Sequence, residues 1–491
     1  MQFGLKKTLS DSAIYGLSNF AQKAIGFLML PIYTRHLTPS DYGTVSMMQI
    51  LLDVVSLFFG MQIETAVFRH YYKARNQEER HRVISSALWF SLALKTLGAG
   101  MLMVFSGAAA TLMFGDASLS TLIAVFAIAV VTESLTFIPF QYIRIQQRPT
   151  LYALASIAKL LTQFGLNIVF IVVLDYGVWG VVASSVISGV IVGSVLSIWL
   201  LSRIGYYFSL EVARSLVNYS WPLILSGVVG IYLGAGNRIA LTQYWGLAEV
   251  GILALASQFS SILRSLVWAP FNQGWGAIRF EVATGPDAQR IFDQNFKLVL
   301  IALVFSGGAI SILAKDIIAV MAAPAFYGAA RVVPIMVLSE VILCFTLFAS
   351  TPLMLKDKTI EMLYSSIIGA VVATVTLFTV VPKYSVMGAA GGALLSSFAG
   401  LCWVVVRSKG MLDVRLPWWR LTSAIIVALL FVTISHISSD VGVAAIIKKS
   451  LLIFGFALAL YVSPTLSGGD REVIHSIISG WIRSRVRMIG Q

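Results

Sequence analysis

Long apolar segments separated by short polar loops run through the whole sequence. Each is close to the ~20 residues that a helix needs to cross a bilayer. The approximate bounds of the fourteen segments are 12–32, 42–61, 83–104, 119–139, 150–174, 177–200, 217–235, 248–270, 296–314, 332–354, 361–381, 386–406, 420–437 and 443–463. Sustained alternation of polar and apolar residues with a period of two is absent from the sequence, so the pattern predicts an all-α polytopic membrane protein.

The composition agrees that a membrane is the main solvent of this chain. Hydrophobic residues make up 58% of its 491 residues, charged residues make up only 12%, and the mean hydropathy is +0.86. A soluble domain carries about twice this share of charged residues. The two cysteines, Cys344 and Cys402, both lie in apolar segments, which excludes a disulfide framework.

The basic residues predict the orientation in the membrane. Lys and Arg number 35 against 22 Asp and Glu, for a formal net charge of +13. With the N-terminus in the cytoplasm, the inner segments contain 24 basic residues and the outer segments seven. Cytoplasmic loops are the ones that carry excess Lys and Arg. Both termini are therefore expected in the cytoplasm, and the charge is interpreted as orientation and not as nucleic-acid binding.

Two short motifs recur about 208 residues later in the chain. Segment 41–43 (DYG) matches 249–251 (EVG), and segment 176–180 (YGVWG) matches 384–388 (YSVMG). The shared offset predicts two six-helix lobes of the same orientation, as in transporters with parallel repeats. The predicted domains are an N-lobe at 1–209, a C-lobe at 210–410, two further spans at 411–463 and a basic cytoplasmic tail at 464–491.

Four ionisable residues are predicted near the middle of the bilayer, namely Lys23, Asp53, Lys95 and Lys159. A charge there costs several kcal/mol unless it is paired or faces water. Lys95 and Lys159 have no obvious carboxylate at their depth, so they are expected to face a substrate. Lys23 and Asp53 lie at matched depth on consecutive helices, which leaves a salt bridge that only locks the hairpin as an alternative.

Uncharged polar residues extend these positions into stripes along single helix faces. The stripe of the first span contains Asn19 and Gln22, and that of the fifth span contains Ser156, Gln163 and Asn167. Such stripes require a wet cavity or a dense polar network. The polar residues also make the first span a poor signal peptide, so it is expected to remain in the membrane.

The second lobe is less charged, and its main ionisable groups are Arg264, Glu340 and Arg238, the last at the outer end of its span. Arg264, like Glu133 of the first lobe, lies close enough to the predicted inner end of its span for its side chain to reach the interface.

Unpaired lysines in a low-dielectric interior favour an anionic cargo, a phosphate above all, because charge attraction strengthens as the dielectric constant falls. Enzyme motifs are missing from the sequence: the histidines have no metal-ligand spacing, and no Gly-rich phosphate loop precedes a lysine. We therefore expect a transporter and not an enzyme, with no metal and no cofactor, driven by an ion gradient, the membrane potential or a substrate gradient.

Several segments resemble a known family. Residues 30–43 (LPIYTRHLTPSDYG) are similar to the stretch that joins the first two helices in polysaccharide-biosynthesis flippases. These are Wzx-type carriers of the multidrug/oligosaccharidyl-lipid/polysaccharide exporter superfamily. Residues 237–251 (NRIAL followed by EVG), 324–330 (PAFYGAA) and 386–390 (VMGAA) resemble further motifs of the family in the same order. Asn237 stands where the family usually has an aspartate before the arginine, so this chain has no acid at that position.

The resemblance implies a carrier with twelve plus two helices that works by alternating access. It would move an undecaprenyl-pyrophosphate-linked oligosaccharide from the cytoplasmic to the periplasmic leaflet of the cell (inner) membrane, for O-antigen, capsule or exopolysaccharide synthesis. The implied partners are this lipid-linked oligosaccharide, the membrane, a polysaccharide polymerase and other assembly proteins, but no nucleic acid.

The central cavity of relatives is cationic, which implies roles for the residues above. The expected substrate contacts are Lys23, Lys95, Lys159, Asn19, Gln22, Gln163, Asn167 and Arg264. The expected groups for charge balance or coupling to a cation are Asp53, Glu133 and Glu340.

Three other functions stay open. A drug/cation antiporter of the same superfamily would have acidic residues in its cavity and usually twelve spans. A lipid II flippase shares fourteen spans and a cationic cavity, although its cavity tends to contain arginines. A non-transporting scaffold for a polysaccharide synthase would tolerate neutral replacements of all three lysines, whereas a carrier would then accumulate lipid-linked repeat units inside the cell.

Overall fold

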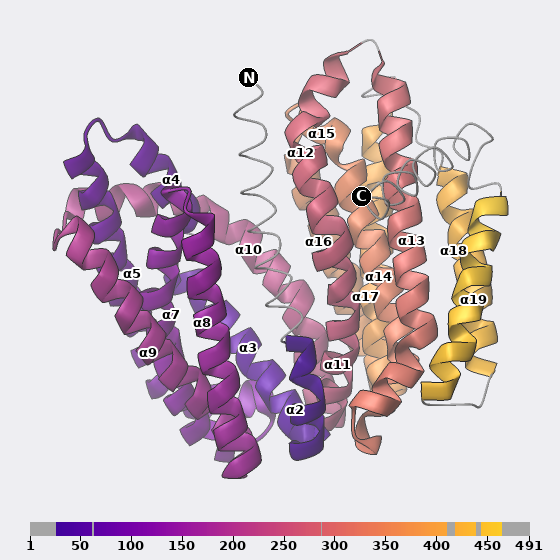
Figure 1. Cartoon of the computed structure of the whole chain (residues 1–491), viewed down its shortest axis with the longest axis horizontal. Coiled ribbons are helices and arrows are strands. Elements are labelled where there is room, and N and C mark those ends of the chain that lie inside the picture. Colours follow the sequence, from indigo (N-terminus) through magenta and orange to yellow (C-terminus); the bar gives the residue numbers. More distant parts are fainter. Residues whose placement is uncertain (1–25, 61–62, 286, 410–417, 438–442, 464–491) are drawn as a thin grey trace, which may run out of the picture. The chain divides into compact units, whose positions relative to one another are not determined.

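The computed structural model describes residues 26–60, 63–285, 287–409, 418–437 and 443–463 (Figure 1). Every regular element in these ranges is a helix, so the predicted all-α fold class is confirmed. Eleven of the helical segments are long and apolar enough to cross a membrane. These eleven overlap eleven of the predicted spans, and the chain is a multi-pass membrane protein.

The other three predicted spans have different outcomes. Most of the predicted first span, 12–32, lies outside the described residues, and so does the predicted basic tail at 464–491. The predicted spans at 217–235 and 443–463 both fall on helices, α10 (Leu210–Trp245) and α19 (Val443–Val462). Neither of these two helices is among the eleven.

The chain divides into two compact units. Among the described residues, the first unit comprises those from 26 to 256, together with 321–332 and 363–400. Its leading helices are α2 (Leu30–His36), α3 (Pro39–Gly60), α4 (Ile63–Lys73), α5 (Gln77–Val104), α6 (Ser106–Ala109), α7 (Ser120–Ile145), α8 (Pro149–Asn167), α9 (Gly177–Ile204) and α10. Short turns of π- and 3₁₀-helix follow some of them, namely η1 (Ala110–Phe114), η2 (Ala117–Leu119) and η3 (Ile168–Val173).

The remaining helices follow in chain order. They are α11 (Leu247–Leu263), the π-helical turn η4 (Arg264–Trp268), α12 (Ala269–Thr284), α13 (Ala288–Met321), the 3₁₀ turn η5 (Pro324–Phe326), α14 (Ala329–Ala349), α15 (Thr351–Leu355), α16 (Ile360–Thr379), α17 (Val381–Ser408), α18 (Trp418–Ile437) and α19. The second unit comprises the described residues of 257–320, 333–362 and 401–463. The predicted lobe boundaries stay predictions.

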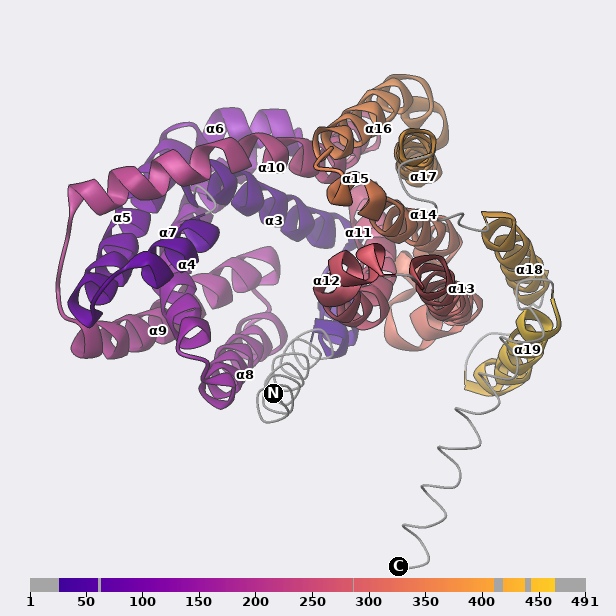
Figure 2. The same cartoon turned by 90° about the horizontal axis from the view of Figure 1, so that it is seen from above.

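Helices α5, α7 and α9 lie side by side in the first unit, with α7 in contact with both others (Figure 2). Glycines on α9 allow the close approach to α7. A Cβ atom added to Gly189 would lie 2.2 Å from the Thr132 hydroxyl oxygen, and one added to Gly193 would lie 2.7 Å from the Leu135 Cβ atom. Small residues at such contacts let membrane helices pack by backbone approach. This packing fixes the face of α7 that carries Glu133.

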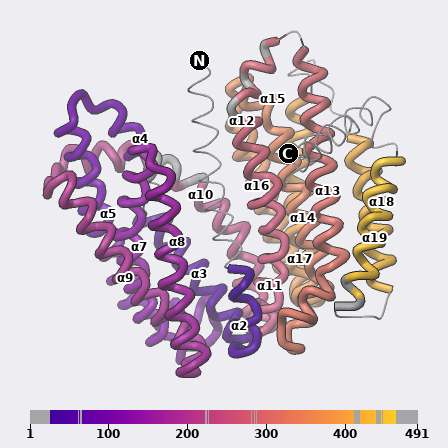
Figure 3. Tube along the Cα trace, in the orientation of Figure 1, coloured from indigo at the N-terminus to yellow at the C-terminus, as the bar shows by residue number. Residues whose placement is uncertain are grey.

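In the second unit, α18 and α19 pack against each other and form a pair at the end of the described chain (Figure 3). Two buried contacts join this pair to α13. The Ser435 hydroxyl donates a hydrogen bond to the Ile312 carbonyl oxygen at 3.0 Å. The Lys449 ammonium lies 2.7 Å from an Asp316 carboxylate oxygen, with both side chains at most 5% exposed. The pair is therefore attached by buried polar bonds as well as by apolar packing.

Candidate functional site

Helices α7 and α8 line a cavity of about 370 Å³ in the first unit. Its polar lining includes Glu133 and Thr136 from α7 and Tyr152, Ser156, Lys159 and Gln163 from α8. The polar stripe predicted along the fifth span is thus real for three of its four members, since Ser156, Lys159 and Gln163 all line the same cavity. The sequence periodicity was sufficient to find this face.

Lys159 is the half-buried cation of this cavity. Its ammonium donates a hydrogen bond to the Thr136 hydroxyl oxygen at 3.3 Å. Thr136 follows Glu133 by one helical turn on α7, and Glu133 attracts the Lys159 charge electrostatically. Within the described ranges, no carboxylate forms an ion pair with Lys159. Its assignment as a substrate contact stays a prediction.

Lys95 differs from the expectation, because it is not unpaired. Its ammonium lies 2.5 Å from a Glu133 carboxylate oxygen, and its side chain is only 4% exposed. The predicted span 119–139 left Glu133 close to a helix end, but α7 extends to Ile145 and places Glu133 at its middle. A buried, neutralised lysine is a poor contact for substrate while this ion pair is intact.

Glu133 is the centre of this polar network. It accepts a hydrogen bond from the Ser56 hydroxyl of α3 at 2.6 Å in addition to its ion pair with Lys95 of α5. One carboxylate on α7 therefore joins three helices and lies beside the fourth, α8. This arrangement is compatible with the expected role of Glu133 in charge balance.

Asp53 lies one turn before Ser56 on α3 and is exposed. Its carboxylate accepts a hydrogen bond from the Gln49 amide at 3.0 Å, and it attracts the charge of Arg238 on α10. The predicted salt bridge to Lys23 falls outside the described residues, as do the predicted contacts Asn19 and Gln22.

Asn167 is not brought to the cavity. Its amide donates a hydrogen bond to the Tyr33 hydroxyl at 2.9 Å, which connects the end of α8 to α2. Tyr33 in turn contacts the edge of the Tyr42 ring. The geometry gives Asn167 a part in helix packing, and nothing in it points to a substrate.

The second unit has its own ion pair between membrane-spanning segments. The Arg264 guanidinium binds the Glu340 carboxylate with two hydrogen bonds, at 2.5 Å and 2.9 Å. The Arg264 side chain is 54% exposed, whereas that of Glu340 is 11% exposed. Arg264 lies in η4, inside a continuous helical segment, Leu247–Gly276, and not near its end as the shorter predicted span suggested.

The two carboxylates lie within one position of the 208-residue offset between the repeated motifs. Glu133 and Glu340 are 207 positions apart, and their partners Ser56 and Arg264 are 208 positions apart. In each unit, a glutamate of one spanning segment binds a side chain 77 or 76 residues earlier in the chain. Ser56 and Arg264 share the 208-residue offset of the DYG and EVG motifs, but the sequence alone does not show which side chains they bind.

In the part of the chain that the structure describes, no group of three or more His, Cys, Asp or Glu side chains could hold a metal ion.

Residues 32–273 match the family model of polysaccharide biosynthesis proteins, which confirms the family resemblance. The succinoglycan biosynthesis transport protein ExoT of Rhizobium meliloti is 22% identical over 268 residues, which are 53% of this chain and 49% of that protein. An uncharacterized membrane protein of Haemophilus influenzae is 28% identical over 90 residues, 18% of this chain and 22% of that protein. The chain thus spans about half the length of the first relative and about a fifth of the second.

Two solved structures share the fold. The lipid II flippase MurJ in an inward closed conformation superposes with a TM-score of 0.73 over 91% of this chain and 98% of that chain, at 12% identity. An inward-facing multidrug resistance MATE family transporter superposes with a TM-score of 0.63 over 81% of this chain and 98% of that chain, at 13% identity. The chain therefore shares the fold of these two transporters.

Proposed function

Starting from this transporter fold and the match to polysaccharide biosynthesis proteins, we propose that the chain is a flippase for lipid-linked oligosaccharides. It moves an undecaprenyl-pyrophosphate-linked repeat unit from the cytoplasmic to the outer leaflet of the inner membrane. The oligosaccharide enters O-antigen, capsule or exopolysaccharide synthesis, for which a polymerase and other assembly proteins are the proposed partners.

The observation that carries the proposed substrate class is Lys159 in its polar cavity. Among the described residues, the Lys159 ammonium donates a long hydrogen bond to one hydroxyl, so in this cavity it is able to bind a phosphate oxygen at the cost of one weak contact. Gln163 and Ser156 on the same face offer neutral hydrogen-bond donors to the phosphate or to the sugar. Because Lys95 is paired with Glu133, Lys159 is the cation of this unit that we propose as the phosphate contact.

The carboxylates are proposed to hold the cations in the empty carrier. Glu133 neutralises Lys95, and Glu340 neutralises Arg264. Arg264 is the more accessible of the two cations, so we assign it as a further anion contact in the second unit. A phosphate that binds Arg264 replaces Glu340, which is thereby freed to bind a proton or another cation. Asp53 is exposed and is a second candidate for such coupling.

The proposal is tested by deleting the gene and restoring it with variants. The deletion strain should accumulate a lipid-linked repeat unit that stays on the cytoplasmic leaflet, detected by mass spectrometry and by its inaccessibility to periplasmic enzymes. The flux restored by Lys159→Gln should be at least ~10-fold lower than the flux restored by the wild-type chain. This is the loss expected when one charged hydrogen bond of about 1.5–3 kcal/mol is removed.

Lys356→Gln is the matched control, because Lys356 is exposed in the loop after α15. It should restore full flux. Normal flux in a well-expressed Lys159→Gln variant would contradict the assignment of Lys159, and normal flux in neutral variants of all three lysines would favour a scaffold. Accumulation of lipid II in place of a glycan repeat unit would favour a lipid II flippase.

A further inference from the structure

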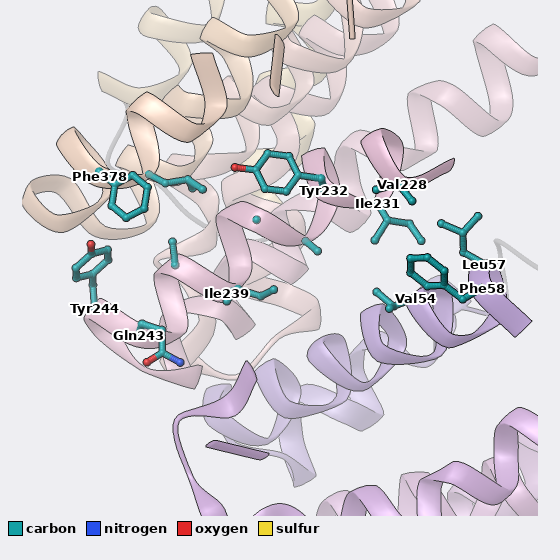
Figure 4. A pocket seen from close by; sticks show the side chains of 14 residues that line it. Val54, Leu57, Phe58, Val228, Ile231, Tyr232, Ile239, Gln243, Tyr244 and Phe378 are labelled. Atoms are coloured by element: carbon teal, nitrogen blue, oxygen red, sulfur yellow. The ribbon is translucent and has the colours of Figure 1, made fainter. Parts of the chain in front are cut away.

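An apolar cleft of about 540 Å³ lies in the first unit between α3, α10 and α16 (Figure 4). Its volume is within the ~300–1,000 Å³ of pockets that bind small molecules. Val54, Leu57 and Phe58 of α3 form one wall, and Phe378 belongs to the wall from α16. All of its lining residues are uncharged, in contrast to the cavity beside Lys159.

Small residues of α10 create the space in this cleft. Ala235, Gly236 and Ala240 all line it, and a Cβ atom added to Gly236 would lie 3.5 Å from a Leu377 methyl group. The Tyr232 hydroxyl is hydrogen-bonded to the Thr374 hydroxyl of α16. This bond holds the Tyr232 ring in the wall of the cleft and satisfies its polar atom within the protein.

Other parts of the described chain leave two aromatic side chains of the cleft walls exposed. Phe58 is 48% exposed and Phe378 is 70% exposed. Both lie on helices that are long and apolar enough to cross a membrane. An open apolar cleft on such helices is occupied by hydrocarbon and not by water.

Helix α3 connects this cleft to the polar network. Val54, Leu57 and Phe58 lie on the cleft side, whereas the Ser56 hydroxyl donates its hydrogen bond to Glu133. Residues three or four apart share a helix face, so the cleft and the network occupy adjacent faces of the same helical turns. A lipid whose phosphate binds Lys159, in the cavity that Glu133 also lines, therefore has an apolar cleft for its chain on the adjacent face of α3.

We propose that this cleft binds the polyprenyl chain of the translocated lipid, an inference that rests on the proposed function. Its proximity to the network favours a chain attached to the bound headgroup over an acyl chain of a bilayer phospholipid, which nothing on α3 would fix in place. Since lipid chains are as apolar as the cleft, occupancy depends on shape and packing and not on hydrophobicity. Filling the cleft with an equally apolar side chain should therefore abolish binding.

The test uses the purified full chain in phosphatidylcholine vesicles with a polyprenyl phosphate that carries a diazirine near the middle of its chain. After illumination, labelled peptides are quantified by mass spectrometry. Peptides of α3 and α10 that line the cleft should carry the label, and Ala240→Phe should reduce this labelling at least ~10-fold. Val195→Phe is the matched control, because Val195 is 63% exposed on α9 and lies outside the cleft. It should leave labelling unchanged.

A second variant covers the case in which Ala240→Phe does not fold. Phe378→Ala removes an exposed wall residue without disturbing a packed core, so it should lower labelling several-fold while thermal stability stays unchanged. Unchanged labelling in Phe378→Ala, or label found equally on α9, would overturn the proposal. A diazirine phosphatidylcholine that labels the cleft equally well, and that polyprenyl phosphate does not displace, would assign the cleft to bilayer lipid and would also overturn it.

Lys159→Gln separates this inference from the proposed function. If the cleft binds the chain but the function is wrong, the cleft is labelled in this variant and its glycan flux is normal. If the function is right but the inference is wrong, flux falls in Lys159→Gln while the cleft of the unmodified chain carries no label.

Discussion

Gly43 of α3 and Gly251 of α11 lie backbone against backbone, although 208 positions separate them in the sequence. A Cβ atom added to Gly43 would lie 2.0 Å from the Leu247 carbonyl oxygen, and one added to Gly251 would lie 2.0 Å from the Pro39 carbonyl oxygen. Pro39 and Leu247 are themselves 208 positions apart and begin the two helices. The contact is therefore symmetric, and the two copies of the repeated motif meet each other at their glycines.

Gly43→Ala is expected to destabilise the protein by more than the ~1–3 kcal/mol of ordinary overpacking, because the obstructing atom belongs to the backbone and cannot rotate away. Gly251→Ala should have the same effect for the same reason. The loss is measured as a lower thermal unfolding temperature in detergent. Gly100→Ala on α5 is the control, since an added Cβ atom meets nothing within 4 Å there. It should be neutral or slightly stabilising, because alanine favours a helix more than glycine does.

The double variant Gly43→Ala/Gly251→Ala gives a second check of the same contact. Once one methyl group has separated the two helices, the second has room, so the two losses should sum to more than the loss in the double variant. Strict additivity would show that the glycines do not share one contact.

Glu133→Gln is expected to leave Lys95 buried without its counter-ion. Removal of one partner of a buried ion pair costs about 3–5 kcal/mol. The variant should therefore insert poorly or unfold at a lower temperature than the unmodified chain, as measured by fluorescence-detected thermal melts. Lys95→Met in the same chain should restore much of the stability, because it removes the orphaned charge and keeps an apolar side chain of similar length.

Equal instability of Glu133→Gln with and without Lys95→Met would contradict this account. In that case the hydrogen bond from Ser56 to Glu133, and not the charge of Lys95, would be the contact that matters. Ser56→Ala measures that contribution separately, with an expected loss of about 1 kcal/mol.

The ion pair of the second unit predicts a difference between arginine and lysine. Arg264→Lys keeps the charge but loses the planar fork that makes two hydrogen bonds to Glu340. We expect normal insertion, because the side chain is 54% exposed, with a several-fold loss of glycan flux in the complementation assay. Full flux in Arg264→Lys would show that only the positive charge is needed at this position.

The sequence predicted which segments are helices better than it predicted where the helices end. The misplaced ends caused errors in the predicted site. Apolar runs locate a span, but the structured helices continue into their polar flanks. The predicted span at 119–139 corresponds to 117–145, and that at 248–270 corresponds to 247–276. Glu133 and Arg264 were therefore expected near the inner ends of their spans, although both lie well inside them.

The sequence also did not show which side chains on different helices bind each other. Helical periodicity alone found the Ser156, Lys159 and Gln163 face, since it depends on one helix. The partner of Lys95 depends on which face of α7 meets α5, and that is fixed by packing against α9 through Gly189 and Gly193. The repeat offset carried part of this information, because Glu133 and Glu340 lie within one position of that offset, but only the contacts show that both are bound in the same way.

A buried ion pair attaches α19 to α13. Lys449 and Asp316 form an ion pair in which the carboxylate is 0% exposed. Lys449→Met should leave Asp316 charged and buried, and should cost about 3–5 kcal/mol or force Asp316 to bind a proton. Lys448→Met changes the neighbouring, exposed lysine in the same way and should cost little.

The double variant Lys449→Met/Asp316→Leu replaces the pair by apolar side chains and should recover most of the stability, since such replacements of buried ion pairs are often neutral or stabilising. Thermal melts and protease release of the 418–463 segment measure the loss. If the double variant is as unstable as Lys449→Met, the unpaired charge of Asp316 is not the cause of the instability. If Lys448→Met and Lys449→Met lose equal stability, the buried contact does not attach these helices.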